Sequence, residues 1–273
     1  MVWSCLVSIL PGMAQTEKLT DYVNPFVGTD GYGNVYPGAQ IPFGGIQISP
    51  DTDSRFYDAA SGYKYNHLTL MGFSLTHLSG TGIPDLGDFL FIPGTGEMKL
   101  EPGTHEDPDQ GYRSRYSHDK EWASPNYYAV ELADYGVKAE MTSGVRSGMF
   151  RFTYPESDNA FIMIDMNHTL WQSCEWSNLR MINDSTITGY KLVKGWGPER
   201  HVYFTATFSK KLTGLRFVQD KKPVIYNTSR FRSSYEAWGK NLMACISFDT
   251  KAGEEVTVKT AISAVSTDGA RNN

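Results

Sequence analysis

The chain has 273 residues, and its 25 Lys and Arg against 30 Asp and Glu give a formal net charge of −5. With 40% apolar residues it can build a packed core, which excludes global disorder. The acidic balance argues against a nucleic-acid binder, which needs a basic face. No run of about 18 apolar residues is present, so the sequence predicts no membrane span.

The first 14 residues resemble a secretory signal peptide. The apolar stretch VWSCLVSIL (2–10) is followed by Gly12 and Ala14, small residues at positions −3 and −1 of a cleavage point before Gln15. The basic residues that usually open such a leader are missing, so the leader is incomplete, and a buried N-terminal strand is the alternative. We expect a secreted or periplasmic protein that loses Cys5 with its leader.

From about residue 21 to residue 111 the chain is rich in Gly, Pro, Asp and Asn and shows few regular periods. This composition predicts loops joined to short strands. So much loop in one block is often functional.

From about residue 126 onward, apolar and polar residues alternate in short runs separated by turn signals, which predicts antiparallel strands. We expect one large all-β domain over residues 15–262, an antiparallel β-sandwich with long N-terminal loops. The expected strands are residues 127–132, 137–141, 149–154, 160–166, 202–208, 242–248 and 256–262, with turns at 133–136, 155–159, 183–185 and 251–253. Residues 263–273 are polar, either a tail or the start of a linker into a further domain.

Three cysteines are too few for a disulfide framework and lack the spacing of a zinc site. We expect Cys174 and Cys245 to be buried free thiols, with a disulfide between them as the alternative. Among Trp171, Trp176 and Trp196 we expect two or three in the core. One at a rim could serve as a platform for a sugar, because aromatic faces stack on sugar C–H surfaces.

The most distinctive string is GTGIPDLGD (80–88). Its glycines would expose backbone N–H groups around Thr81 that can hold a sugar hydroxyl or an anion. The alternative is a turn in which Asp85 and Asp88 accept hydrogen bonds from the backbone.

The histidine and carboxylate patterns select no catalytic or metal site. His67 and His77 lie ten residues apart and lack metal-ligand spacing, so we expect each to be hydrogen-bonded in a polar loop. The acidic segment 105–109 is expected to be a solvated loop, with calcium as the alternative. Paired carboxylates would suit glycoside hydrolysis, but no spacing selects a pair.

Taken in order, several strings are specific enough to compare with a known family. Together they resemble the N-terminal domain of glycoside hydrolase family 92, the calcium-dependent exo-α-mannosidases. The resemblance runs from about Tyr22 to the last residue and rests on YVNPFVGT (22–29), PGA (37–39), PFG (42–44), SPDT (49–52), SGY (61–63), GFS (72–74), THLSGTG (76–82) and DLGD (85–88), with VYF (202–204) and GARNN (269–273) later.

The resemblance implies a supersandwich of the galactose-mutarotase kind, followed by a helical linker and an (α/α)6 catalytic barrel. In that family the barrel supplies the general acid Glu, the general base Asp and most of the calcium site. The chemistry is hydrolysis with inversion, for which the two carboxyls stand about 6.5–9.5 Å apart. The barrel lies outside this chain, so the resemblance implies no catalytic residue and no metal ligand here. Calcium is expected for the full enzyme, with its ligands mostly outside this chain.

The resemblance also implies a contribution of this domain to the sugar pocket, through one segment near the −1 mannose and one that reaches the +1 subsite. Members selective for α-1,2 linkages carry Trp where this chain has Ile83, which argues against an α-1,2 preference. The expected substrate-binding residues are Ala60, Ser61 and Gly62 in the first segment and Gly80, Thr81, Gly82, Ile83 and Asp85 in the second.

The leading hypothesis is the N-terminal, sugar-pocket-forming domain of a secreted α-mannosidase that acts on mannose-containing glycans. Its partner would be the missing C-terminal (α/α)6 catalytic domain, and the isolated chain would be inactive. A stand-alone carbohydrate-binding β-sandwich is the alternative, and a structural β domain whose loops only pack is a third hypothesis. A sandwich that covers a barrel should also present a large apolar patch when alone.

Overall fold

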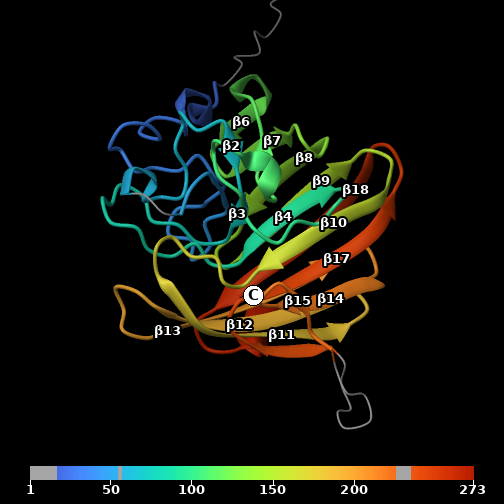
Figure 1. Cartoon of the computed structure of the whole chain (residues 1–273). Coiled ribbons are helices and arrows are strands. Elements are labelled where there is room, and N and C mark those ends of the chain that lie inside the picture. Colours follow the sequence, from blue (N-terminus) through green and yellow to red (C-terminus); the bar gives the residue numbers. More distant parts are fainter. Residues whose placement is uncertain (1–16, 55–56, 226–234) are drawn as a thin grey trace, which may run out of the picture.

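The computed structural model describes residues 17–54, 57–225 and 235–273, so the expected leader and Cys5 lie outside the described residues. Two large antiparallel sheets stack on each other, and the N-terminal loops gather beside one end of them, at the upper left of Figure 1. This confirms the expected all-β antiparallel sandwich with long N-terminal loops.

The larger sheet has nine strands, and each pairs antiparallel with its neighbours. In spatial order they are β16 (Glu236–Gly239), β11 (Ser173–Asn183), β12 (Thr186–Lys194), β13 (Arg200–Phe208), β18 (Glu254–Ser263), β9 (Ser147–Tyr154), β8 (Val137–Ser143), β7 (Tyr127–Leu132) and β6 (Glu121–Ser124).

The smaller sheet has seven strands, three of which come from the N-terminal part of the chain. In spatial order they are β1 (Ser49–Asp51), β3 (Gly72–Ser74), β4 (Leu90–Thr95), β10 (Ser157–Asp165), β17 (Leu242–Thr250), β14 (Gly214–Gln219) and β15 (Lys222–Pro223). A separate pair, β2 (Thr69–Leu70) and β5 (Ser114–Arg115), lies among the loops.

The main core fills the space between the two sheets, where alternate apolar residues of each strand meet. β10 is buried on both faces. Ile162 and Ile164 point to the main core, whereas Phe161 and Met163 pack in a second cluster on the outer face of the seven-stranded sheet. This explains why the strand has a continuous apolar run rather than an alternating one.

All seven expected strands are present, and the turns at 133–136 and 251–253 fall between strands, whereas the turn expected at 183–185 begins on Asn183, the last residue of β11. The expected turn at 155–159 is too long, because β10 already begins at Ser157. The sequence did not predict β11 and β12. Cys174 and Cys245 are buried free thiols, as expected.

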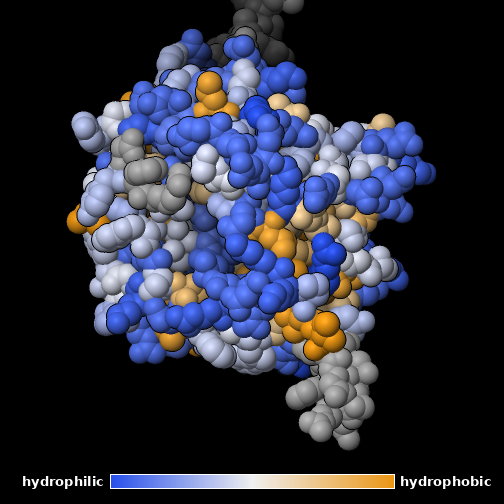
Figure 2. Space-filling model, in the orientation of Figure 1, coloured by the Kyte–Doolittle hydropathy of each residue, from blue (hydrophilic) through white to orange (hydrophobic). Residues whose placement is uncertain are grey.

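Helices are short in the described part of the chain: η1 (Leu19–Tyr22), η2 (Tyr57–Ala59), η3 (Pro108–Gln110), η4 (His118–Lys120) and α1 (Thr267–Arg271). None of the helices described is long and apolar enough to cross a membrane. α1 begins at a Ser266 cap, whose Oγ accepts from Gly269 N–H (2.9 Å), and it packs on β18 and β13. The face of the molecule in Figure 2 is mostly hydrophilic, with its apolar residues in several separate patches.

Candidate functional site

The loop after η2 is held close to β1 by a glycine in the left-handed region. Gly62 has φ +86° and its carbonyl accepts from the N–H of Thr52 (2.6 Å). A Cβ at this position would approach Asp51 Oδ1 well inside 3.0 Å, a distance that real Cβ atoms essentially never reach. Only glycine fits here. Ala60 and Ser61 are also buried, so all three expected residues of the first segment lie beneath the surface of the described chain.

Asp51, at the end of β1, is buried between two histidines. The Nε2 atoms of His77 and His168 each lie 2.8 Å from one of its carboxylate oxygens. The other ring nitrogen of His77 lies 2.8 Å from the carbonyl oxygen of Gln47. Both nitrogens of His77 therefore face acceptor oxygens. Burial raises the pKa of the Asp51 carboxyl, but attraction to His77 and the hydrogen bonds from both rings outweigh burial and hold it well below its usual range.

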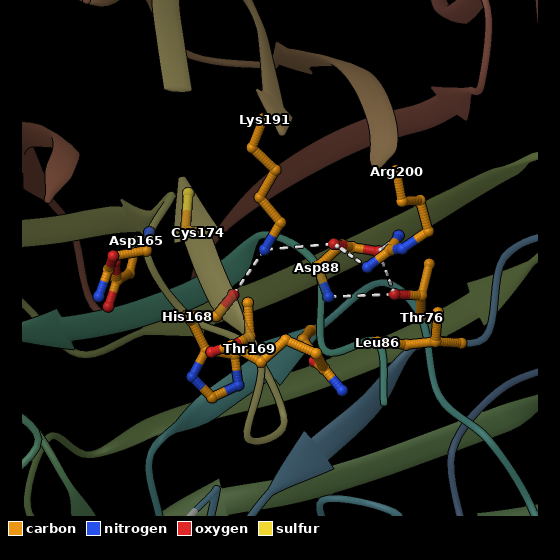
Figure 3. A network of polar contacts seen from close by, with 12 residues as sticks. Thr76, Leu86, Asp88, Asp165, His168, Thr169, Cys174, Lys191 and Arg200 are labelled. Carbon is orange, nitrogen blue, oxygen red and sulfur yellow. Dashed lines mark hydrogen bonds and ion pairs between the residues drawn. The ribbon is translucent and has the colours of Figure 1, made fainter. Parts of the chain in front are cut away.

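Asp88, just before β4, is the centre of a second buried group (Figure 3). Lys191 Nζ lies 3.2 Å from one carboxylate oxygen, while Arg200 donates to both oxygens at 2.6 and 3.1 Å. The Thr76 hydroxyl donates to the carboxylate at 2.7 Å. Burial raises the pKa of Asp88, but attraction to Lys191 and Arg200 together with the hydrogen bonds from Arg200 and Thr76 outweighs burial and holds the pKa well below its usual range, so this carboxyl also stays ionised.

His168 joins the two groups. Its ring binds Asp51, and its carbonyl oxygen accepts from Lys191 Nζ at 2.6 Å. The result is one continuous polar network, defined by Asp51, His77, His168, Lys191 and Asp88 with their partners. Gly62 packs on its Asp51 end, and Asp88 closes the segment 80–88 at its other end. The network therefore fixes both loops that the sequence singled out.

The 80–85 segment is more exposed than the first loop. Gly80 has φ +73° and its N–H donates to the Asn34 carbonyl (2.7 Å). Gly82 is exposed, Thr81 is half-buried, and Ile83 is 41% exposed. Ile83 thus presents an aliphatic side chain to solvent at the position where a ligand-facing residue was expected.

Asp85 is mostly buried and its carboxylate is taken up by the backbone. Oδ1 accepts from the N–H of Leu86 (2.6 Å), and Oδ2 from the N–H of Trp196 (3.4 Å). Asp85 therefore accepts hydrogen bonds from the backbone, as in the turn considered as the alternative in the sequence analysis. The bond to Trp196 also joins the segment to the connection between β12 and β13.

A cleft of about 790 Å³ opens beside the network, at the end of β10. Asp165, His168, Gln172 and Tyr112 are among the residues that line it. Burial raises the pKa of the Asp165 carboxyl, an effect that the nearby His168 only partly offsets. Burial likewise raises the pKa of Tyr112 well above its ordinary value. The cleft therefore combines neutral and charged hydrogen-bonding groups.

The expectation for the tryptophans was wrong. Trp171, Trp176 and Trp196 are each more than 40% exposed, so none is a core residue. The reason for Trp176 is that β11 alternates faces and turns this side chain to the outer face of the nine-stranded sheet.

His67 and His77 are both hydrogen-bonded, as expected. The ring of His67 bonds to Thr52 Oγ1 (2.9 Å), and that of His105 bonds to Thr69 Oγ1 (2.9 Å). The exposed Asp109 pairs with Arg115, which fits a solvated loop. Within the described residues no group of three or more His, Cys, Asp or Glu side chains could hold a metal ion.

The network contains residues that the sequence did not flag: Asp51, His168, Lys191 and Arg200. Asp51 lies inside the SPDT string, and His168 in an Asn-His-Thr tripeptide that matches a glycosylation sequon. Neither pattern indicates that the two side chains meet across 117 residues of sequence.

Two solved structures with this fold are family 92 glycoside hydrolases. The family 92 glycosyl hydrolase ccman5 superposes with a TM-score of 0.76 at 26% sequence identity, over 93% of this chain and 33% of that one. The family 92 inverting mannosidase BT2199 from Bacteroides thetaiotaomicron gives 0.75 at 24% identity, over 94% and 33%. The fold is thus that of a glycoside hydrolase β-sandwich domain.

The family follows from the sequence match. The model of the glycosyl hydrolase family 92 N-terminal domain matches residues 22–263, so the chain belongs to this family. An uncharacterized secreted glycosidase from Arthroderma benhamiae is 30% identical over 139 residues, half of this chain. The chain spans 17% of that protein and about a third of each solved structure. The resemblance seen in the sequence is confirmed.

Proposed function

We propose that this chain is the N-terminal, sugar-pocket-forming domain of a secreted α-mannosidase that hydrolyses terminal α-linked mannose from glycans with inversion. The observation that carries the proposal is the family match over residues 22–263. The solved inverting mannosidase with the same fold supports it, as does the relative named as a secreted glycosidase.

In this proposal the catalytic carboxylates lie in a separate catalytic domain. A general acid must hold a proton at working pH, and a general base must reach the attacking water. Asp51 and Asp88 do neither, because both are fully buried and ionised, Asp51 between two histidine rings and Asp88 beside Lys191 and Arg200. Their role is to position the two loops. A pocket with one fixed arrangement loses less binding free energy to ordering when the substrate binds.

Calcium, if the full enzyme uses it, would be held mostly by residues outside this domain. The proposal therefore assigns no metal ligand among Asp51, Asp88 and Asp165. It also assigns this chain no step of proton transfer.

The test uses the protein that carries this chain, purified from its natural source, beside the 273-residue chain. The natural protein should release mannose from an α-mannobioside, and proton NMR should detect β-mannose first, the product of inversion. Chelation with EDTA should abolish release, and added calcium should restore it. The 273-residue chain should bind without turnover.

Two outcomes would contradict the proposal. Early release of α-mannose would refute inversion. Turnover by the 273-residue chain alone would place the catalytic groups inside it. If the natural protein has the mass of this chain and binds mannosides without cleaving them, the stand-alone binding sandwich replaces the enzyme domain.

A further inference from the structure

Trp171 is a strained and exposed aromatic residue at the rim of the 790 Å³ cleft. Its backbone has φ +80°, a region that bulky side chains rarely occupy, and its side chain is 59% exposed. A solvent-exposed indole in a left-handed backbone gains little from packing. Strain of this kind, at about 1–3 kcal/mol per residue, is typical of functional positions.

The turn that carries Trp171 is fixed on both sides. The N–H of Leu170 donates to the carbonyl of Leu86 (2.9 Å), and the side-chain amide of Gln172 donates to the carbonyl of Pro84 (3.0 Å). The surrounding structure therefore imposes the backbone conformation and projects the indole outward. The same bonds join this turn to the 80–88 segment.

A second aromatic ring and a buried acceptor complete the site. The ring of Tyr57 is 58% exposed, and its centroid lies 6.0 Å from that of Trp171. Gln172 lines the cleft, and its Oε1 atom is buried without a hydrogen-bond partner. A buried acceptor of this kind is costly unless a ligand or water satisfies it.

The charges around the cleft favour an uncharged ligand. Lys221 pairs with Glu101 at 2.5 Å, and His168 pairs with Asp51. Asp165 adds a further carboxyl to the lining. These groups leave no excess positive charge for a phosphate or carboxylate, and a polar lining does not suit a purely apolar ligand. Aromatic rims over hydrogen-bonding groups suit a polyhydroxylated ring, whose C–H face stacks on the electron-rich aromatic face.

We propose that Trp171, Tyr57 and Gln172 form an additional subsite for one sugar ring of a mannose-containing glycan, next to the pocket-forming loops. The inference rests on the proposed function for the choice of mannose. The site borders both loops, because Gln172 bonds to Pro84 and η2, which begins at Tyr57, leads directly into Ala60. A glycan chain held by those loops can extend over the Trp171 ring.

Isothermal titration of the 273-residue chain with α-mannotriose tests the subsite. The informative variant is Trp171→Gly, because glycine accepts φ +80° and the variant should fold at least as stably as the wild type. The matched control is Trp238→Ala, which removes a ring that is 53% exposed on β16, in the nine-stranded sheet. Trp171→Phe keeps an aromatic face, and thermal unfolding checks each fold.

We expect Trp171→Gly to weaken α-mannotriose binding by at least about tenfold. Trp171→Phe should retain most of the affinity, and Trp238→Ala all of it. Maltotriose should bind more weakly than α-mannotriose. Equal affinity of Trp171→Gly and wild type, an equal loss in Trp238→Ala, or no binding by the wild-type chain would overturn the subsite. If the subsite is overturned but the natural protein releases mannose, the enzyme proposal still stands. If binding depends on Trp171 but the natural protein releases no mannose, the enzyme proposal is refuted and the subsite stands.

Discussion

Replacing Gly62 by alanine should destabilise the chain far more than a loop substitution normally does. The added Cβ meets two obstacles. The first is the backbone, because φ +86° suits glycine and costs other residues about 1–2 kcal/mol. The second is the buried pair beneath it: the Cβ collides with Asp51 Oδ1 and lies 3.2 Å from the His77 ring.

The size of the second effect follows from burial. Asp51 and His77 are fully buried and hydrogen-bond at 2.8 Å, and leaving a buried carboxylate without its partner costs about 3–5 kcal/mol. The collision displaces the carboxylate without removing it, so we expect part of this cost. Together the two effects should lower the free energy of unfolding by about 3–5 kcal/mol. Gly80→Ala is the matched control, since Gly80 has φ +73° but open space around its Cβ. It should cost only about 1 kcal/mol.

Urea unfolding of the two variants and the wild type measures both values. With a slope of about 2–3 kcal/mol per M urea, Gly62→Ala should lower the midpoint by about 1–2 M, and Gly80→Ala by less than about 0.7 M. Equal midpoints for the two variants would refute the argument, because backbone strain would then account for the whole effect and Asp51 would not constrain the loop.

Four further predictions concern charge and specificity. Lys191→Met should destabilise the chain by about 3 kcal/mol because it leaves Asp88 with one cationic partner fewer, whereas Lys211→Met, at an exposed pair, should cost under about 1 kcal/mol in the same urea assay. Asp88 has a folded pKa below its unfolded value near 4, so its contribution is complete above that value and is lost as pH falls further; thermal stability should drop below about pH 4. The effect of Asp165 on stability has the opposite sign, because its pKa is raised by burial and its ionised form destabilises the folded chain. Asp165→Asn should therefore stabilise the chain at pH 7 but not at pH 3. In the natural enzyme, Ile83→Trp should raise kcat/KM for α-1,2-linked mannobiose relative to the other linkages, and unchanged ratios would show that residue 83 does not contact the +1 sugar.

The sequence predicted strands wherever one pattern ran uninterrupted. Residues 202–208 alternate strictly, and β13 spans them. β11 was missed because bulges between Cys174 and Trp176 and between Met181 and Asn183 break its period of two. β12 was missed because Gly189 and Lys191 occupy inward positions that normally hold apolar residues. Local patterns cannot reveal such strands, because tertiary contacts compensate for each exception.

The site was less predictable than the fold. The glycines at 62 and 80 could be singled out from the family resemblance, and both adopt positive φ. The side chains that hold the loops could not, because charged residues are usually assigned to the surface. Lys191 has no solvent exposure, and its carboxylate partner lies 103 positions earlier, at Asp88. Only the three-dimensional register of the strands brings the two together.

Filling the end of a sandwich with a buried polar network costs desolvation free energy. A buried ion pair is often no more stabilising than apolar side chains of similar volume, because desolvation offsets the attraction. Unlike apolar packing, hydrogen bonds require specific partners at specific positions. Asp51 accepts from His77 and His168, which lie 26 and 117 residues away in the sequence. A one-residue slip in strand register would therefore leave a buried charge without a partner. Apolar packing would tolerate small shifts of the loops, whereas these bonds allow one arrangement. The position of each of the two loops is thereby tied to the register of both sheets, which is the rigidity that the proposed sugar pocket would require.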